Sequence, residues 1–294
     1  MNNPQVVTII LNWNNYEDTK RCIKSLSNQN YTNHEIVVVD NGSIDGSGER
    51  IDDEFDIRTY FTNENLGFAK GINTGVKVAK EFNPEFYWVV NNDVECTSEE
   101  TLQTLVSAFH ENPDFGAISP VIKDGDGDIW YEAGEINWDT GTVNHTSIER
   151  EGNYYKENSY LPLCAALIDA DLLNEIGGVP EKYFLYYEDV DFCQRVKQKD
   201  RPLVTSFSTS VEHRTSSSSG GPLGEIPTYY QARNYLLFLE EYGGKVDGYK
   251  RHYVSLNVKK LAIRIANYQI SSCLALVRGI FDGYMKKSGR GPYP

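Results

Sequence analysis

Three carboxylates crowd the ten-residue stretch YYEDVDFCQR, which runs from 186 to 195. Glu188, Asp189 and Asp191 occupy three of four consecutive positions, next to aromatic residues. Like charges and apolar surroundings both raise the pKa of a carboxyl group, and a raised pKa makes its carboxylate a stronger base. The stretch therefore predicts a general base. The structural alternative is the start of a helix, where the helix dipole stabilises negative charge.

Two further polar clusters follow apolar runs of the kind that form buried strands. Asp40 and Asn41 follow EIVVV, and Asn91, Asn92 and Asp93 follow YWVV. An acid at the carboxyl end of a parallel strand can hydrogen-bond a nucleobase or a ribose. A carboxylate with amide neighbours can hold a hard divalent cation that keeps water or phosphate ligands. Turn or N-cap roles are the simpler alternatives for both acids.

The first part of the chain alternates apolar runs with segments of helical spacing. We expect strands at 6–11, 35–40, 57–62 and 86–93, and helices at 16–29, 67–82 and 98–113, the last with Ser98 as its N-cap. This alternation predicts β-α-β units and a mainly parallel sheet. Because ligands bind at the carboxyl ends of such strands, the polar residues found there should lie at one edge.

The rest of the chain changes character. Residues 114–160 are turn-rich with short aromatic strands, and a strand at 161–168 and a helix at 169–176 follow. Helical periodicity begins again at Val190, the SSSSGG run at 216–221 predicts a flexible loop or linker, and 228–243 and 250–287 are expected to be helical.

Composition limits the class of protein. With 294 residues, of which 40% are hydrophobic, the chain suits one large domain or a domain with an appendage. A formal net charge of −14 argues against a nucleic-acid-binding protein. The five cysteines include no C-x-x-C pair, so reduced thiols are expected. The start, MNNPQVV, lacks the pattern of a signal peptide, which predicts a cytoplasmic location.

The C-terminal region differs from the rest in charge. Residues 225–294 contain 11 Lys+Arg against 5 Asp+Glu, and apolar residues recur at 254, 258, 261, 265 and 268. This helical spacing with flanking cations predicts peripheral contact with the cytoplasmic face of a membrane through 250–287. The alternatives are packing on the catalytic domain or on another subunit of a homo-oligomer.

Taken together, the order of the motifs resembles the inverting glycosyltransferases of family 2, which have the GT-A fold. The motifs are a strand followed by DNGS, then NENLGFAKGINTGV, NND, YYEDVDFCQR and VEHR, and the resemblance covers about 5–243. It is strongest to the branch of rhamnosyltransferases and related sugar transferases of surface polysaccharides.

The resemblance implies an α/β GT-A fold, with a mainly parallel sheet flanked by helices and a C-terminal helical extension. Residues 1–224 would form the catalytic domain that binds the nucleotide sugar, and 225–294 the basic helical region. The implied reaction moves a sugar from a nucleotide-diphosphate-sugar donor to a hydroxyl of a glycan or lipid-linked acceptor. Assembly of cell-surface polysaccharide or glycoprotein glycans is the implied setting.

The resemblance also implies roles for individual residues. Asp189 would be the general base beside Glu188, while Asp93 and His213 would hold a divalent metal, Mg²⁺ or Mn²⁺. The residues implied in nucleotide-sugar binding are Asn12, Asp40, Asn41, Gly67, Asn73, Asn92 and Asp93. The sequence departs from the family pattern at Asn91, which replaces the first acid of the D-x-D motif. With one carboxylate fewer, the metal site alone should be weaker.

Other functions fit less well. A nucleotidyltransferase usually has a glycine-rich basic loop after the first strand, where this chain has NWNNYEDTK, and no G-x-G-x-x-G of a NAD-dependent dehydrogenase is present there. A non-catalytic nucleotide-sugar-binding protein is disfavoured by the retained Glu188-Asp189 pair and Asp93. A transferase further requires Asp93 and Asp189 to face each other across one cleft about a sugar wide.

Overall fold

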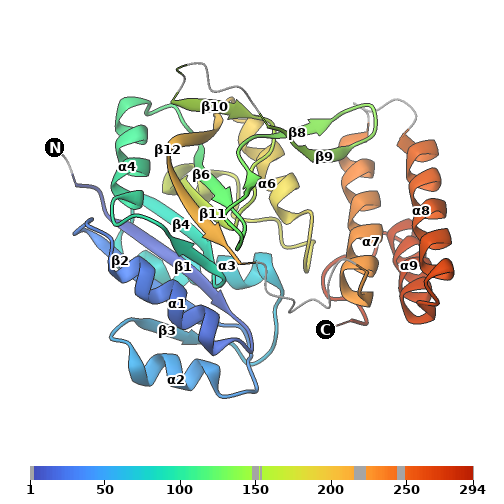
Figure 1. The fold of residues 1–294 in the computed structure, drawn as a ribbon, viewed down its shortest axis with the longest axis horizontal. Coiled ribbons are helices and arrows are strands. Elements are labelled where there is room, and N and C mark those ends of the chain that lie inside the picture. Colours follow the sequence, from blue (N-terminus) through green and yellow to red (C-terminus); the bar gives the residue numbers. More distant parts are fainter. Residues whose placement is uncertain (1–2, 148–151, 153, 215–222, 244–248, 294) are drawn as a thin grey trace.

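The computed structural model describes residues 3–147, 152, 154–214, 223–243 and 249–293. A curved central sheet is flanked by helices, and three C-terminal helices stand together at one side of the molecule (Figure 1). The α/β architecture with a helical C-terminal extension is the one predicted from the sequence. The predicted loop at 216–221 lies outside the described residues.

The first half of the sheet is built from β-α-β units, as expected. Four parallel strands lie in the order β4-β1-β2-β3: β1 (Val6–Asn12), β2 (His34–Asp40), β3 (Arg58–Phe61) and β4 (Phe86–Asn91). Their connections are α1 (Tyr16–Ser27), α2 (Ser47–Glu54) and α3 (Phe68–Ala79), which continues into a 3₁₀ turn, η1 (Lys80–Phe82). With right-handed crossovers, α1 and α2 lie on one face of the sheet and α3 on the other (Figure 1).

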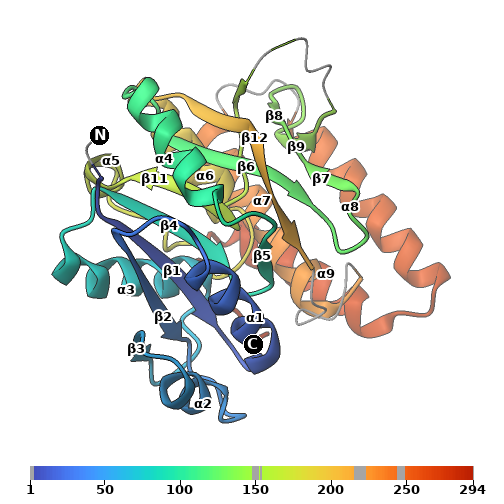
Figure 2. The ribbon, with the colours of Figure 1, turned by 60° about the vertical axis from the view of Figure 1, so that its left-hand side comes forward.

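The second half of the sheet is mixed. After α4 (Thr101–Glu111), the chain forms β6 (Ala117–Lys123), β10 (Tyr155–Asn158), β11 (Ala165–Asp169) and β12 (Leu203–His213). Strand β11 is antiparallel to both β4 and β6, and β12 is parallel to β6. Strands β1, β2, β4, β6 and β12 therefore run in one direction, with the antiparallel β11 between β4 and β6 (Figure 2). The sheet is mainly parallel, as the alternation predicted.

Two local features differ from the expectation. Helix α4 begins at Thr101 with Glu100 as its N-cap residue, so the N-cap prediction for Ser98 was wrong; the Ser98 hydroxyl instead accepts from the Glu100 N–H at 3.2 Å. The long strand β12 was not anticipated. Its register against β6 shifts between Ser206 and Ser210, opposite Pro120, where β6 has no N–H to donate.

Four short strands lie near the ends of β6 and β12. Strand β5 (Val94–Cys96) pairs with the end of β12, and β7 (Ile129–Tyr131) pairs with β6. Strands β8 (Gly134–Asn137) and β9 (Thr142–His145) form a separate two-stranded ribbon. The turn-rich segment thus has short aromatic strands as expected, but it also contains β6, a full central strand of the sheet.

Helices complete the second half of the chain. They are α5 (Ala170–Glu175), α6 (Glu188–Lys197), α7 (Glu225–Tyr242), α8 (Tyr249–Ala266) and α9 (Ile270–Tyr284). Phe238 and Tyr242 of α7 belong to the main hydrophobic core, so this helix packs on the α/β body. The predicted long helical stretch at 250–287 is confirmed but broken in two by a turn after Ala266. Within the described chain, no helix is both long and apolar enough to cross a bilayer.

Candidate active site

Four of the candidate polar segments meet at one edge of the sheet. Asn12, Asp40 and Asn91 are the last residues of β1, β2 and β4, and His213 is the last residue of β12. Asn12 is in register with Asp40, and Leu11 with Asn91. Because these strands run in the same direction, their polar ends lie along a common edge, where α/β sheets bind ligands.

Asn12 is a positioning residue for Asp40. Its side chain is fully buried, and its amide donates to Oδ2 of Asp40 at 2.7 Å and to the hydroxyl of Ser47 at 2.9 Å. Its Oδ1 accepts from the hydroxyl of Thr19 at 2.8 Å, which in turn accepts from the side-chain amide of Asn92 at 3.0 Å. This network connects the ends of β1, β2 and β4 and holds the Asp40 carboxylate in one orientation.

Asn41 and Gly67 join the end of β2 to the loop that precedes α3. The Asn41 side chain accepts from the Leu66 N–H at 3.0 Å and donates to Oδ1 of Asn65 at 3.1 Å. Gly67 has φ of +80°, and a Cβ there would lie 2.3 Å from the carbonyl oxygen of Phe184. The loop can therefore approach the segment before the Glu188-Asp189 pair only because this position has no side chain.

Asn73 lies away from this edge and has a structural task. Its side chain donates to the carbonyl of Val179 at 2.8 Å and to Glu181 at 2.9 Å, and accepts from the Val179 N–H at 2.9 Å. These bonds attach α3 to the turn at 178–181. The expected contact of Asn73 with a nucleotide sugar stays a prediction.

Asp93 and His213 form a close pair at the tip of the sheet. Nε2 of His213 lies 3.0 Å from Oδ1 of Asp93, and each side chain is about 10% exposed. The pairing of β5 with β12 places them, since Val94 is in register with His213. A hydrogen bond of 2.9 Å from the Arg214 N–H to the Asp93 carbonyl fixes the same turn.

The pair fits two ligands of a divalent cation. Two adjacent ligands of an octahedral ion, each about 2.1 Å from it, stand about 3.0 Å apart, which matches the observed separation. A carboxylate suits Mg²⁺ and Mn²⁺, and an imidazole adds preference for a transition metal. Among the described residues, no three His, Cys, Asp or Glu side chains gather as a metal site. Of the described residues, Asp93 and His213 are therefore the two candidate ligands of such a cation.

The three crowded acids have different environments. Asp191 is fully buried and neutralised: Lys182 Nζ lies 2.5 Å from its Oδ2, and Arg195 Nε lies 3.0 Å from its Oδ1. The Tyr242 hydroxyl donates to the same Oδ1 at 2.9 Å and ties α7 to α6. Asp191 is therefore a structural acid at the junction of these helices.

Glu188 and Asp189 lie in the first turn of α6 and affect each other's titration. Burial, and then the charge of Asp189, raises the pKa of Glu188 well above its usual range. Burial also raises the pKa of Asp189, but Asp189 accepts from the Tyr160 hydroxyl at 2.7 Å and from the Val190 N–H at 2.8 Å, which favours its ionised form. Oε2 of Glu188 has no hydrogen-bond partner among the described residues. The hydrogen bonds to Asp189 therefore favour its charge more than the surroundings of Glu188 favour that of Glu188.

The backbone before this pair is strained. Tyr186 and Tyr187 have φ of +67° and +75°, a left-handed conformation that bulky residues rarely adopt. Asn234 of α7, fully buried, donates its side-chain amide to the carbonyls of Leu185 at 2.8 Å and Tyr186 at 2.9 Å. These bonds stabilise the strained turn that positions Asp189. Such strain is typical of functional sites.

A chain of aromatic contacts links the two halves of the site. The ring of Trp130 lies 5.3 Å from that of His213 and 4.8 Å from that of His145. His145 stacks on Tyr160 at 6.0 Å, and Tyr160 donates to Asp189. Because a carbonyl only accepts, the 3.0 Å contact between His145 and the Trp130 carbonyl places the proton on Nδ1. None of Trp130, His145 and Tyr160 was a candidate from the sequence.

The buried thiol of Cys164 lies near both Asp93 and Asp189. Burial raises the pKa of its thiol, and the charges of Asp93 and Asp189 both raise it further. Both carboxylates therefore lie near one buried side chain. The aromatic contacts described above connect the same two acids by a second route.

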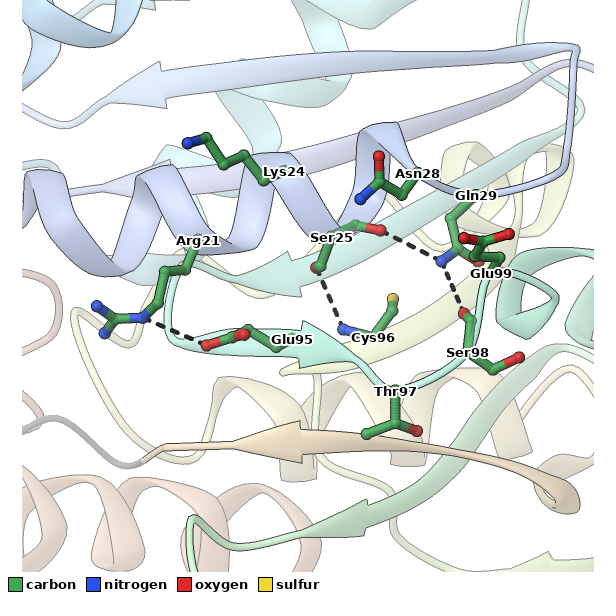
Figure 3. Close-up of a pocket in the computed structure, with 10 residues that line it drawn as sticks. All are labelled: Arg21, Lys24, Ser25, Asn28, Gln29, Glu95, Cys96, Thr97, Ser98 and Glu99. Atoms are coloured by element: carbon green, nitrogen blue, oxygen red, sulfur yellow. Dashed lines mark hydrogen bonds and ion pairs between the residues drawn. The ribbon is translucent and has the colours of Figure 1, made fainter.

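A separate surface hollow of ≈ 360 Å³ lies between α1 and β5 (Figure 3). Two of its charged side chains pair with each other, since Arg21 Nε lies 3.3 Å from Oε1 of Glu95. The Ser25 hydroxyl also accepts from the Cys96 N–H at 3.2 Å, which ties α1 to β5. None of the candidate site residues lines it, so it is distinct from the site at the sheet edge.

Comparisons with known proteins identify the family of the chain. A family model described as glycosyl transferase family 2 matches residues 7–177, more than half of the chain. The low-salt glycan biosynthesis hexosyltransferase Agl10 of Haloferax volcanii is 27% identical over 65% of this chain and 61% of its own length. An N-acetylglucosaminyl-diphospho-decaprenol L-rhamnosyltransferase of Mycobacterium tuberculosis is 23% identical over 76% of this chain and 81% of its own length.

Solved structures show the same fold. The mannosyltransferase PcManGT of Pyrobaculum calidifontis, in complex with GDP-Man and Mn²⁺, has a TM-score of 0.63 at 15% identity and covers 98% of this chain and 89% of its own. A crystal structure of GalNAc-T7 with UDP, GalNAc and Mn²⁺ has a TM-score of 0.65 at 15% identity and covers 81% of this chain and 48% of its own.

Proposed function

Because this chain belongs to glycosyl transferase family 2, we propose that it is an inverting enzyme that uses Asp189 as its general base. The observation that carries the proposal is the unbroken series of contacts between the two acids, which runs from Asp93 through His213, Trp130, His145 and Tyr160 to Asp189. One acid is paired with a histidine and suits the leaving group, whereas the other has a raised pKa and suits the attacking group. Two acids with separate tasks are what a direct displacement needs.

On the donor side, Asp40 binds the nucleoside of a nucleotide-diphosphate-sugar. Asn12, which also donates to the Ser47 hydroxyl, holds the Asp40 carboxylate at the end of β2. The backbone N–H of Ser43 donates to Oδ1 of Asp40 at 3.0 Å. Asp93 and His213 would hold a divalent metal there. When bound, the metal neutralises the negative charge that develops on the leaving diphosphate. Solved relatives of this fold with Mn²⁺ support this choice.

On the acceptor side, a hydroxyl oxygen attacks the anomeric carbon as the bond from that carbon to the diphosphate breaks. The hydroxyl proton passes to Asp189, and the nucleoside diphosphate leaves with the bonding electron pair. Proton removal of this kind contributes roughly 10²–10⁴-fold. The Tyr160 hydroxyl orients the Asp189 carboxylate, and Asn234 stabilises the turn that precedes Asp189.

The acceptor we propose is a lipid-linked glycan. One relative is by name a rhamnosyltransferase that acts on N-acetylglucosaminyl-diphospho-decaprenol, a lipid-linked sugar. The hexosyltransferase of Haloferax volcanii acts in glycan biosynthesis. Both support glycan assembly as the setting.

A donor screen tests the proposal. Purified protein is incubated with UDP-, GDP- and dTDP-sugars in the presence of Mn²⁺ or Mg²⁺, and released nucleotide is measured. We expect metal-dependent release from one nucleotide class, with inversion at the anomeric carbon when an acceptor is glycosylated. Donor binding by calorimetry without any release, with and without added acceptor lipid, would instead identify a non-catalytic nucleotide-sugar-binding protein.

A further inference from the structure

Helices α8 and α9 form an antiparallel hairpin with an exposed apolar surface. The two helices are joined by a short turn and pack against each other (Figure 1). On α9, one stripe at helical spacing is apolar and exposed. It consists of Ile270 (73%), Leu274 (66%), Val277 (54%), Phe281 (56%) and Tyr284 (55%). Soluble proteins rarely expose so many large apolar side chains together.

The opposite face of α9 is already used for packing. A Cβ at Gly279 would lie 2.5 Å from the carbonyl oxygen of Tyr229, and one at Gly283 would lie 3.1 Å from that of Arg233. These glycines let α9 approach the α7 backbone closely, as Figure 1 shows for the two helices. The apolar stripe therefore points away from the body of the molecule.

Further apolar side chains are exposed at the turn of the hairpin and on α8. Tyr268, in the turn, is 90% exposed. On α8, Val254, Val258 and Ile265 are more than half exposed and share one side of the helix by their spacing. We call the exposed apolar side chains of α8, the turn and α9 the hairpin surface.

Charge identifies what this surface would contact. Residues 249–287 contain 8 Lys+Arg and a single acid, Asp282, in a chain of net charge −14. Asp282 is 1% exposed and is neutralised by Arg278 and Lys287. The hairpin thus presents cations and apolar side chains to solvent, with no carboxylate of its own exposed.

From this combination we propose that the hairpin surface docks on a lipid bilayer that carries anionic headgroups. The apolar stripe enters the boundary between headgroups and acyl chains, and Lys250, Arg251 and Lys259 remain at the level of the headgroups. A second copy of the chain fits less well, because a symmetric dimer through this surface would bring two basic faces together. The proposal does not depend on the chemistry at Asp189, since docking needs neither donor nor acceptor.

Vesicle flotation of the full chain tests this docking. The vesicles contain phosphatidylcholine with or without phosphatidylglycerol, and the fraction of floated protein is measured at low and high salt. We expect binding to the anionic vesicles that weakens with salt. The triple variant Ile270→Ser, Leu274→Ser, Val277→Ser should partition at least about tenfold more weakly, since each lost side chain removes buried apolar area.

Two further variants separate the surface from general effects. Tyr60→Ser with Phe61→Ser removes two exposed aromatics from the edge strand β3, and it should float like the unmodified protein. Lys250→Glu with Arg251→Glu should lose the preference for anionic vesicles. Equal flotation of the apolar triple variant and the unmodified protein, or no flotation at all, would overturn the proposal. So would a dimer in sedimentation equilibrium that the triple variant dissociates.

Discussion

Replacement of Tyr160 by phenylalanine isolates the hydrogen bond that keeps Asp189 ionised. The Tyr160 hydroxyl donates to Oδ2 of Asp189 at 2.7 Å, and the variant Tyr160→Phe removes that donor while keeping the ring. Without the donor, the charged carboxylate is less stable relative to its acid form, so the pKa of Asp189 rises further.

The magnitude follows from the strength of such a bond. A hydrogen bond to a charged group contributes about 1.5–3 kcal/mol, and 1.36 kcal/mol corresponds to one pH unit. Asp189 is partly exposed, so water replaces part of the lost bond and the lower end applies. We expect the acidic limb of the pH–rate profile to move to higher pH by about one unit.

The assay is nucleotide release from the best donor of the screen, measured as kcat against pH. The matched control is Tyr155→Phe, which removes a tyrosine–carboxylate bond of 3.1 Å to Glu111, remote from the site. Its profile should coincide with that of the unmodified enzyme. An unmoved acidic limb in Tyr160→Phe, with kcat preserved, would show that Asp189 is not the group whose ionisation limits the rate.

Two other predictions concern the metal pair and the structural acid. His213→Ala removes one of the two ligands proposed to hold the metal, so the Mn²⁺ concentration for half-maximal release should rise more than about tenfold; an unchanged Mn²⁺ requirement would exclude His213 from the metal site. Asp191→Asn leaves Arg195 without its charge partner and Lys182 with Glu241 alone, so the free energy of unfolding should fall by about 2–3 kcal/mol. This is less than for a fully buried pair, because both cations are partly exposed. Denaturant unfolding measures this loss, and stability equal to the unmodified protein would contradict the structural role.

Much of the fold could be predicted because local pattern and burial agree in the first half of the chain. The sequences that form β1, β2 and β4 are uninterrupted apolar runs with several β-branched residues. Such runs are expected of strands that are covered on both faces. Their direction places Asn12, Asp40 and Asn91 at one edge. That inference needed only the alternation of strands and helices.

The rest of the site depends on contacts between distant segments. Strand β12 is rich in serine and threonine and bulges opposite Pro120, so its alternation is weak, yet it carries His213 to the metal pair. Tyr160 and Asn234 are ordinary residues in sequence, and only packing brings them to Asp189 and to the strained turn. No periodicity in a single sequence records such pairings.

The three crowded acids show the same limit of prediction from sequence. Their spacing predicted a group with a raised pKa, which holds for Glu188 and Asp189. The spacing did not distinguish Asp191 from the other two acids. Asp191 is structural because it forms ion pairs with Lys182 and Arg195. The distinction depends on where the cations of neighbouring elements lie.

The most direct measurement compares Asp189→Asn with the unmodified enzyme in donor binding and in turnover. Asparagine keeps the shape of the side chain but cannot take the acceptor proton. We predict an unchanged donor Kd by calorimetry and a fall in kcat of roughly 10²–10⁴-fold. A kcat equal to that of the unmodified enzyme would contradict the assignment of Asp189 as the base.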